Sequence, residues 1–154
     1  MTGAAAASWD KHAGGALSAL AGLAPLAAGG VAGGLGSLVL YAVGLDPVAD
    51  RELAATLSNA QVGLVFAVTA IVAVATGWVL QQAGSLRWGL AALVAAGLVD
   101  ALGHVLPRLT YATEADTLPV WAVALLFGVH GARVAILAGC VAVGAWLAAR
   151  KDRA

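Results

Sequence analysis

The chain has 154 residues, of which 62% are hydrophobic and only 10% are charged. Eight basic and eight acidic side chains leave a formal net charge of zero, which argues against the large basic surface that nucleic-acid binding requires. The mean hydropathy of +0.93 is far above that of soluble domains, so we expect residues 1–154 to form one integral membrane domain. The single cysteine can form neither a disulfide nor a zinc-cysteine cluster within one chain.

The first predicted span covers about residues 25–45, a length that suits the hydrocarbon core of a bilayer. We expect its helix to begin at Pro25, because proline lacks the N–H that would stay unbonded in a first helical turn. Residues 13–23 precede it and are rich in Ala, Gly and Leu. They either lie along the membrane interface or extend the first helix.

The second and third predicted spans cover about residues 58–80 and 86–106. Ser58 and Gln61 have the S-x-x-Q spacing of a capping box, in which each side chain bonds a free backbone N–H at a helix start. Pro107 is expected to end the third span, and a polar loop is expected to follow it. A fourth span then runs over about 119–149.

Four spans predict an all-α fold, a polytopic membrane protein built as a four-transmembrane-helix bundle with both termini on one side. Lysine and arginine near the ends of spans are retained in the cytoplasm. Two basic residues lie on one side of this arrangement, and the other side holds five: Lys11, Arg87, Arg150, Lys151 and Arg153. The sequence therefore predicts a multi-pass protein of the cell membrane with cytoplasmic N and C termini.

Glycines recur in the first span with the spacing that lets two helices approach closely. Gly29 is followed four residues later by Gly33, and Gly30 by Gly34. This pattern favours packing within one subunit. The alternative is an interface for a homo-oligomer or for a larger membrane complex.

Four ionisable side chains fall inside the third and fourth spans, where a charge in hydrocarbon is costly. Asp100 and His104 are four residues apart, and His130 and Arg133 are three residues apart, so each pair shares one face of its helix. Asp100 and Arg133 are predicted to form an ion pair, because each removes the cost of leaving the other unpaired.

The two intramembrane histidines are expected to lie at the same depth. Trp88 and Trp146 are predicted to sit at the cytoplasmic headgroup level, as indoles commonly do. Sixteen residues separate Trp88 from His104, and sixteen separate His130 from Trp146. At about 1.5 Å per residue, both imidazoles lie about 24 Å from that level, in the outer half of the membrane.

The preferred interpretation is a metal or haem site inside the membrane. His104, His130 and Asp100 offer two nitrogens and one oxygen, a ligand set that suits copper, zinc or iron. Alternatively, His104 and His130 are the axial ligands of a b-type haem, with Arg133 near a propionate. Gln61 on the second span reaches a similar height and could support either site from the second shell.

Two other functions stay open at this point. The polar cluster could be purely structural, in an accessory membrane subunit whose buried ion pair holds the helices in register. It could also transfer protons, since imidazole gains and loses a proton near neutral pH. The sequence contains no G-x-S-x-G, phosphate-loop, C-x-x-C or H-E-x-x-H motif, so any enzymatic chemistry would depend on the intramembrane cluster.

Overall fold

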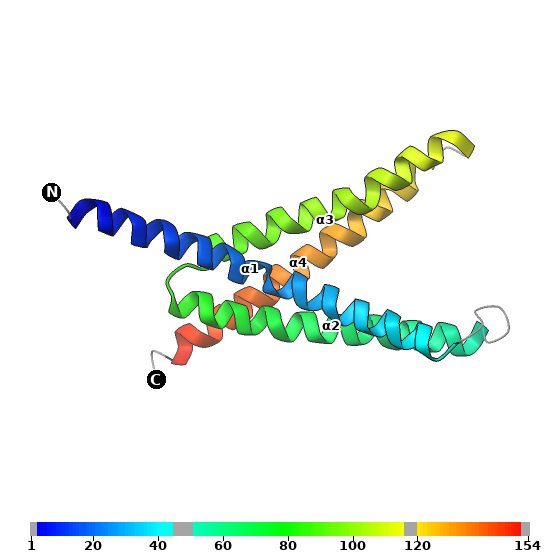
Figure 1. Cartoon of the computed structure of the whole chain (residues 1–154), viewed down its shortest axis with the longest axis horizontal. Coiled ribbons are helices and arrows are strands. Elements are labelled where there is room, and N and C mark those ends of the chain that lie inside the picture. The colour runs from blue at the N-terminus through cyan, green and yellow to red at the C-terminus, as the bar shows by residue number, and fades with distance from the viewer. Residues whose placement is uncertain (1–2, 45–50, 116–119, 152–154) are drawn as a thin grey trace.

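The protein is all-helical over the part of the chain that the computed structural model describes, which is residues 3–44, 51–115 and 120–151. Side chains are described within the ranges 14–44, 51–107, 121–125 and 127–151. Four helices account for nearly all of this chain (Figure 1): α1 (Gly3–Ala42), α2 (Arg51–Gln82), α3 (Leu86–Ala115) and α4 (Val120–Lys151). Each helix contains a stretch long and apolar enough to cross a membrane, which confirms the all-α fold and the number of candidate spans.

Helix α1 begins earlier than the sequence predicts. Pro25 lies inside it rather than at its start, and residues 13–23 extend the same helix. In an apolar environment a helix satisfies its own backbone groups, so an Ala- and Gly-rich run stays helical and a single proline is tolerated. The predicted end of this span at Leu45 and the loop after it lie outside the described residues.

The predicted boundaries of α2 and α3 are also too short. Helix α2 begins at Arg51, so Ser58 lies two turns inside it and the capping box with Gln61 is wrong. Helix α3 continues through Pro107 as far as Ala115, well into the segment predicted as a loop. Hydropathy marks only the apolar part of a helix. The polar residues of a helix that extends past this part are therefore easily predicted as a loop.

Helices α2 and α4 make the most extensive contact in the molecule. A Cβ atom added at Gly77 would collide with the backbone carbonyl of Val141, and one added at Gly144 would collide with that of Val74. The two helices therefore touch backbone to backbone, as small residues permit in membrane proteins. Gly22 of α1 meets the backbone of Gly89 of α3 in the same way.

The hydrophobic core lies beside these glycine contacts and draws on three helices. Its fully packed side chains are Ala73, Leu93, Leu137 and Val141. Basic and aromatic side chains gather beyond this core, where α2 ends, α3 begins and α4 ends. Three cation–π contacts mark this end: Arg150 over Trp146 at 4.4 Å, Arg87 over Trp88 at 5.7 Å and Lys151 over Trp78 at 5.7 Å.

On the other side of the core the helices separate into two arms (Figure 1). One arm pairs the C-terminal half of α1 with the N-terminal half of α2, and the other pairs the C-terminal half of α3 with the N-terminal half of α4. Helices α2 and α3 make few contacts with each other. The bundle is therefore closed in one half and open in the other.

Candidate functional site

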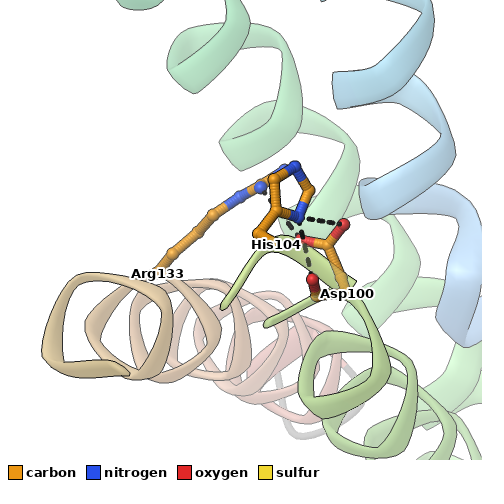
Figure 2. Close-up of polar contacts among 3 residues, drawn as sticks. All are labelled: Asp100, His104 and Arg133. Carbon is orange, nitrogen blue, oxygen red and sulfur yellow. Dashed lines mark hydrogen bonds and ion pairs between the residues drawn. The ribbon is translucent and has the colours of Figure 1, made fainter. Parts of the chain in front are cut away.

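The four ionisable residues within the candidate spans of α3 and α4 lie on the arm that these two helices form. Asp100 and His104 are on consecutive turns of α3, and His130 and Arg133 are on α4. Figure 2 shows the Arg133 side chain extending from α4 across to Asp100, with the His104 ring beside both groups. As predicted, the two residues of each pair lie on one face of their helix, and the two faces meet to form the cluster.

The predicted ion pair between Asp100 and Arg133 is present. Nη1 of Arg133 lies 3.4 Å from Oδ2 of Asp100, which is long for a charge-assisted hydrogen bond. The other carboxylate oxygen, Oδ1, lies 3.5 Å from Nδ1 of His104. Asp100 therefore lies between a cationic and an imidazole side chain, and neither of them holds its carboxylate by a short bond.

The two histidines face each other at one level, as the residue counts predict. Their ring centroids are 5.2 Å apart with an interplanar angle of 33°. Nδ1 of His104 lies 2.8 Å from the backbone carbonyl oxygen of Asp100. A carbonyl oxygen only accepts, so this nitrogen carries the proton and Nε2 is left with the free lone pair. Metal-binding histidines commonly have this arrangement.

One ligand atom from each of Asp100, His104 and His130 lies within 4.8 Å of the other two. Bonds of about 2.0 to 2.2 Å from a central ion to nitrogen or oxygen place such atoms about 3 to 4 Å apart. Side-chain rotations that move these atoms by about 1 Å would complete the set, a displacement within the reach of ordinary rotamer adjustment.

The cluster is partly exposed, most of all at His104. The His104 side chain is 55% exposed, against 37% for Asp100 and 31% for Arg133. Immediately below the cluster the arm is closed, because a Cβ atom at Gly97 of α3 would collide with the side chain of Val134 on α4. The cluster is thus exposed on the side of His104, whereas α3 and α4 pack closely on the side of Gly97.

Two residues that sequence reasoning missed lie beside the guanidinium of Arg133. A Cβ atom at Gly29 of α1 would lie 2.8 Å from Oγ1 of Thr69 on α2 and 3.6 Å from Nη2 of Arg133. Arg133 therefore reaches from α4 to the place where α1 and α2 meet. The sequence predicts only a helix-packing role for this glycine, and Thr69 carries no signal in the sequence that separates it from other threonines of the span.

Gln61 is hydrogen-bonded to α1 in this structure. Its Nε2 donates hydrogen bonds to the backbone oxygen of Gly33, at 2.9 Å, and to Oγ of Ser37, at 3.1 Å, both on α1. Gly36 leaves room for the amide, because a Cβ atom there would lie 2.6 Å from Cγ of Gln61. Its contacts thus join the α1–α2 arm, and support of a metal ligand by this residue stays a prediction.

The glycine pattern of α1 divides into two faces. Gly29 and Gly33 face α2, where a Cβ atom at Gly33 would be 3.9 Å from the side chain of Val65. Gly30 and Gly34 have open space beside them. One half of the pattern thus packs within the subunit, and an oligomer interface through the other half stays a prediction.

No protein family matches the chain, and no curated protein or solved structure matches it either. Its function is therefore argued from the geometry and chemistry of the cluster.

Proposed function

We propose that this protein binds a divalent transition-metal ion inside the membrane through Asp100, His104 and His130. The observation that carries the proposal is the mutual approach of three ligand atoms, within 4.8 Å, from two helices. Two imidazoles and one carboxylate suit copper, zinc or iron, and three protein ligands leave a coordination position open for water or a substrate. Nδ1 of His104 donates to the backbone carbonyl of Asp100, so Nε2 of the neutral ring is the nitrogen that would bind the ion.

The geometry favours a bare ion over a b-type haem. A haem held by both histidines would place its porphyrin between two rings whose centroids are 5.2 Å apart, beside an Asp100 oxygen that lies within 4.8 Å of a nitrogen of each ring. The close contact of Gly97 with Val134 also keeps α3 and α4 together one to two turns away. A haem would have to part the helices at this contact, whereas an ion requires only side-chain rotation.

The second candidate is a structural cluster with no ligand, as in an accessory membrane subunit. Its support is that Asp100 already has partners: Arg133 pairs with its carboxylate, and His104 bonds its backbone oxygen. Polar contacts of this kind join helices in apolar surroundings. The two candidates differ in one measurable respect, because a structural cluster needs no metal in stoichiometric amount.

Metal titration of the purified chain separates these candidates. Protein stripped with a chelator is dialysed against Zn²⁺ at controlled free concentration, and bound metal is counted. We expect one ion per chain, and a loss of affinity of at least about tenfold in His104→Ala and in His130→Ala. His12→Ala, which removes the remaining histidine of the chain, is the matched control and should bind as the wild type does. Equal binding in all four proteins would contradict the proposal.

A variant of Arg133 adds a second comparison to the same titration. Its guanidinium lies 3.4 Å from the Asp100 carboxylate, so its positive charge opposes a dication at that oxygen. We expect Arg133→Gln to bind Zn²⁺ more tightly than the wild type. A structural cluster predicts a less stable protein without this gain in affinity.

We further propose that the tryptophan-rich end of the bundle faces the cytoplasm of a cell membrane, which puts both termini there and the metal site in the outer half. The support is the excess of basic side chains at this end, three of them stacked on indoles. Single cysteines at Asp50 and Glu114, in a Cys140→Ala background, should react with an impermeant thiol reagent in intact cells. A cysteine at Lys151 should react only after lysis, and the reverse result would invert the topology.

A further inference from the structure

A cavity of about 370 Å³ lies between α2 and α4, separate from the three proposed metal ligands. This volume is within the range of small-molecule sites. Its walls are mainly apolar and include Val65, Phe66, Ile136 and Leu137. Its polar lining includes Gln61, Thr69 and the guanidinium-bearing side chain of Arg133. An apolar cavity with one cation and a few neutral polar groups is typical of sites for amphipathic ligands.

The guanidinium of Arg133 has hydrogen-bonding capacity that the protein leaves unused. It carries five N–H donors. Among the residues whose side chains are described, it makes one hydrogen bond, the 3.4 Å contact with Asp100. Its Nη2 lies near Gly29 and Thr69, 3.6 Å from the position that a Cβ atom would take at the glycine. Unpaired donors cost free energy in apolar surroundings. A ligand that brings a hydrogen-bond acceptor into the cavity would remove this cost, and an anionic acceptor would do so most effectively.

We infer that this cavity binds a single-chain amphipathic carboxylate of the fatty-acid class. The carboxylate pairs with Arg133, whose planar fork matches two carboxylate oxygens. The hydrocarbon chain lies along Phe66, Ile136 and Leu137. A neutral alkyl chain or a lipid tail would leave the donors of Arg133 unpaired, and a cavity of about 370 Å³ matches one hydrocarbon chain better than two.

The existing ion pair leaves donors of Arg133 for this ligand. Asp100 contacts only Nη1 of Arg133, at 3.4 Å, so the rest of the guanidinium fork can pair with a second carboxylate. The hydroxyl of Thr69 donates its proton to the backbone oxygen of Val65 at 2.5 Å, so it offers no donor to a carboxylate. The ligand head would thus lie at Arg133, between α2 and α4.

Saturable binding of radiolabelled decanoate to the chain in phosphatidylcholine nanodiscs tests the inference, with protein-free nanodiscs subtracted for partition into lipid. EDTA is present throughout, so the outcome does not depend on the metal site. We expect unlabelled decanoate to compete, and decanol and decyltrimethylammonium, which have the same chain with other heads, to compete at least about tenfold less well. Competition by decanol as strong as by decanoate would overturn the inference.

Two pairs of variants complete the test. Arg133→Gln should weaken decanoate binding about tenfold or more, and Arg133→Lys should restore part of it. Ala70→Phe fills the cavity and should abolish saturable binding, whereas Ala67→Phe, on an exposed position of the same helix, should leave it unchanged. The second pair keeps the test valid if Arg133→Gln does not fold. Wild-type affinity in Arg133→Gln or in Ala70→Phe, or no saturable binding to the wild type, would overturn the inference.

Discussion

The two halves of this bundle differ in how closely their helices pack and in the side chains that lie between them. In the half with the tryptophans, α2 and α4 touch at Gly77 and Gly144, and apolar side chains pack beside them. In the other half the helices diverge into two arms, and the side chains between them include Asp100, His104 and Arg133. The closed half supplies the packing that holds the helices together. The open half can therefore contain ionisable side chains whose burial in apolar surroundings costs free energy.

Filling a glycine contact of the closed half should have the largest effect. In Gly77→Val the new side chain meets the backbone carbonyl of Val141, which cannot move aside as a side chain can. We expect a loss of about 3 kcal/mol in unfolding free energy, at the upper end of overpacking effects. Denaturant unfolding in mixed micelles measures it.

Gly139→Val is the matched control for this substitution, because it makes the same change in α4 where open space lies beside the glycine. Its effect should stay within about 0.5 kcal/mol. Similar losses at Gly77 and Gly139 would mean that the backbone contact is not what holds the closed half together.

Breaking the ion pair of the open half should have an intermediate effect. Asp100→Ala and Arg133→Ala should each cost about 2 kcal/mol, less than the roughly 3–5 kcal/mol of a fully buried pair, because their contact is long, at 3.4 Å. The double variant should recover much of the combined loss, since neither charge is then left alone. Additive losses in the double-mutant cycle would show that the two groups do not interact.

The smallest effect is expected on the α1–α2 arm. Gln61→Leu removes the hydrogen bonds to Gly33 and Ser37, and a net cost of about 1 kcal/mol is typical of such bonds. The same change at Gln82, an exposed residue at the end of α2, should leave stability within about 0.5 kcal/mol. Equal effects at both positions would show that the Gln61 amide does not join α1 to α2.

Much of the architecture can be predicted from the sequence, because hydropathy marks four spans directly. The ends of the helices cannot, as Pro25, Ser58 and Pro107 show: each has the chemistry of a helix end and lies inside a helix. Local end signals are weak where the surroundings are apolar, since a backbone without water as a partner stays helical.

The polar cluster also has features that the sequence predicts and features that it does not. The level of His104 with His130 and the pairing of Asp100 with Arg133 could be predicted, because each depends on helical rise and on spacing along one helix. The contact of Arg133 with the junction of α1 and α2 could not, because it depends on how the arms cross. Crossing angles are set by glycine contacts between helices, which a single sequence does not pair.

The central claim, that two histidines and a carboxylate hold one metal ion, is tested most directly by electron paramagnetic resonance of the chain loaded with one equivalent of Cu²⁺. Nitrogen hyperfine structure reports how many imidazoles bind the ion. We predict two equivalent nitrogens in the wild type, one in His104→Ala and one in His130→Ala, and the wild-type pattern in His12→Ala. A wild-type spectrum that is unchanged when His104 or His130 is removed would contradict it.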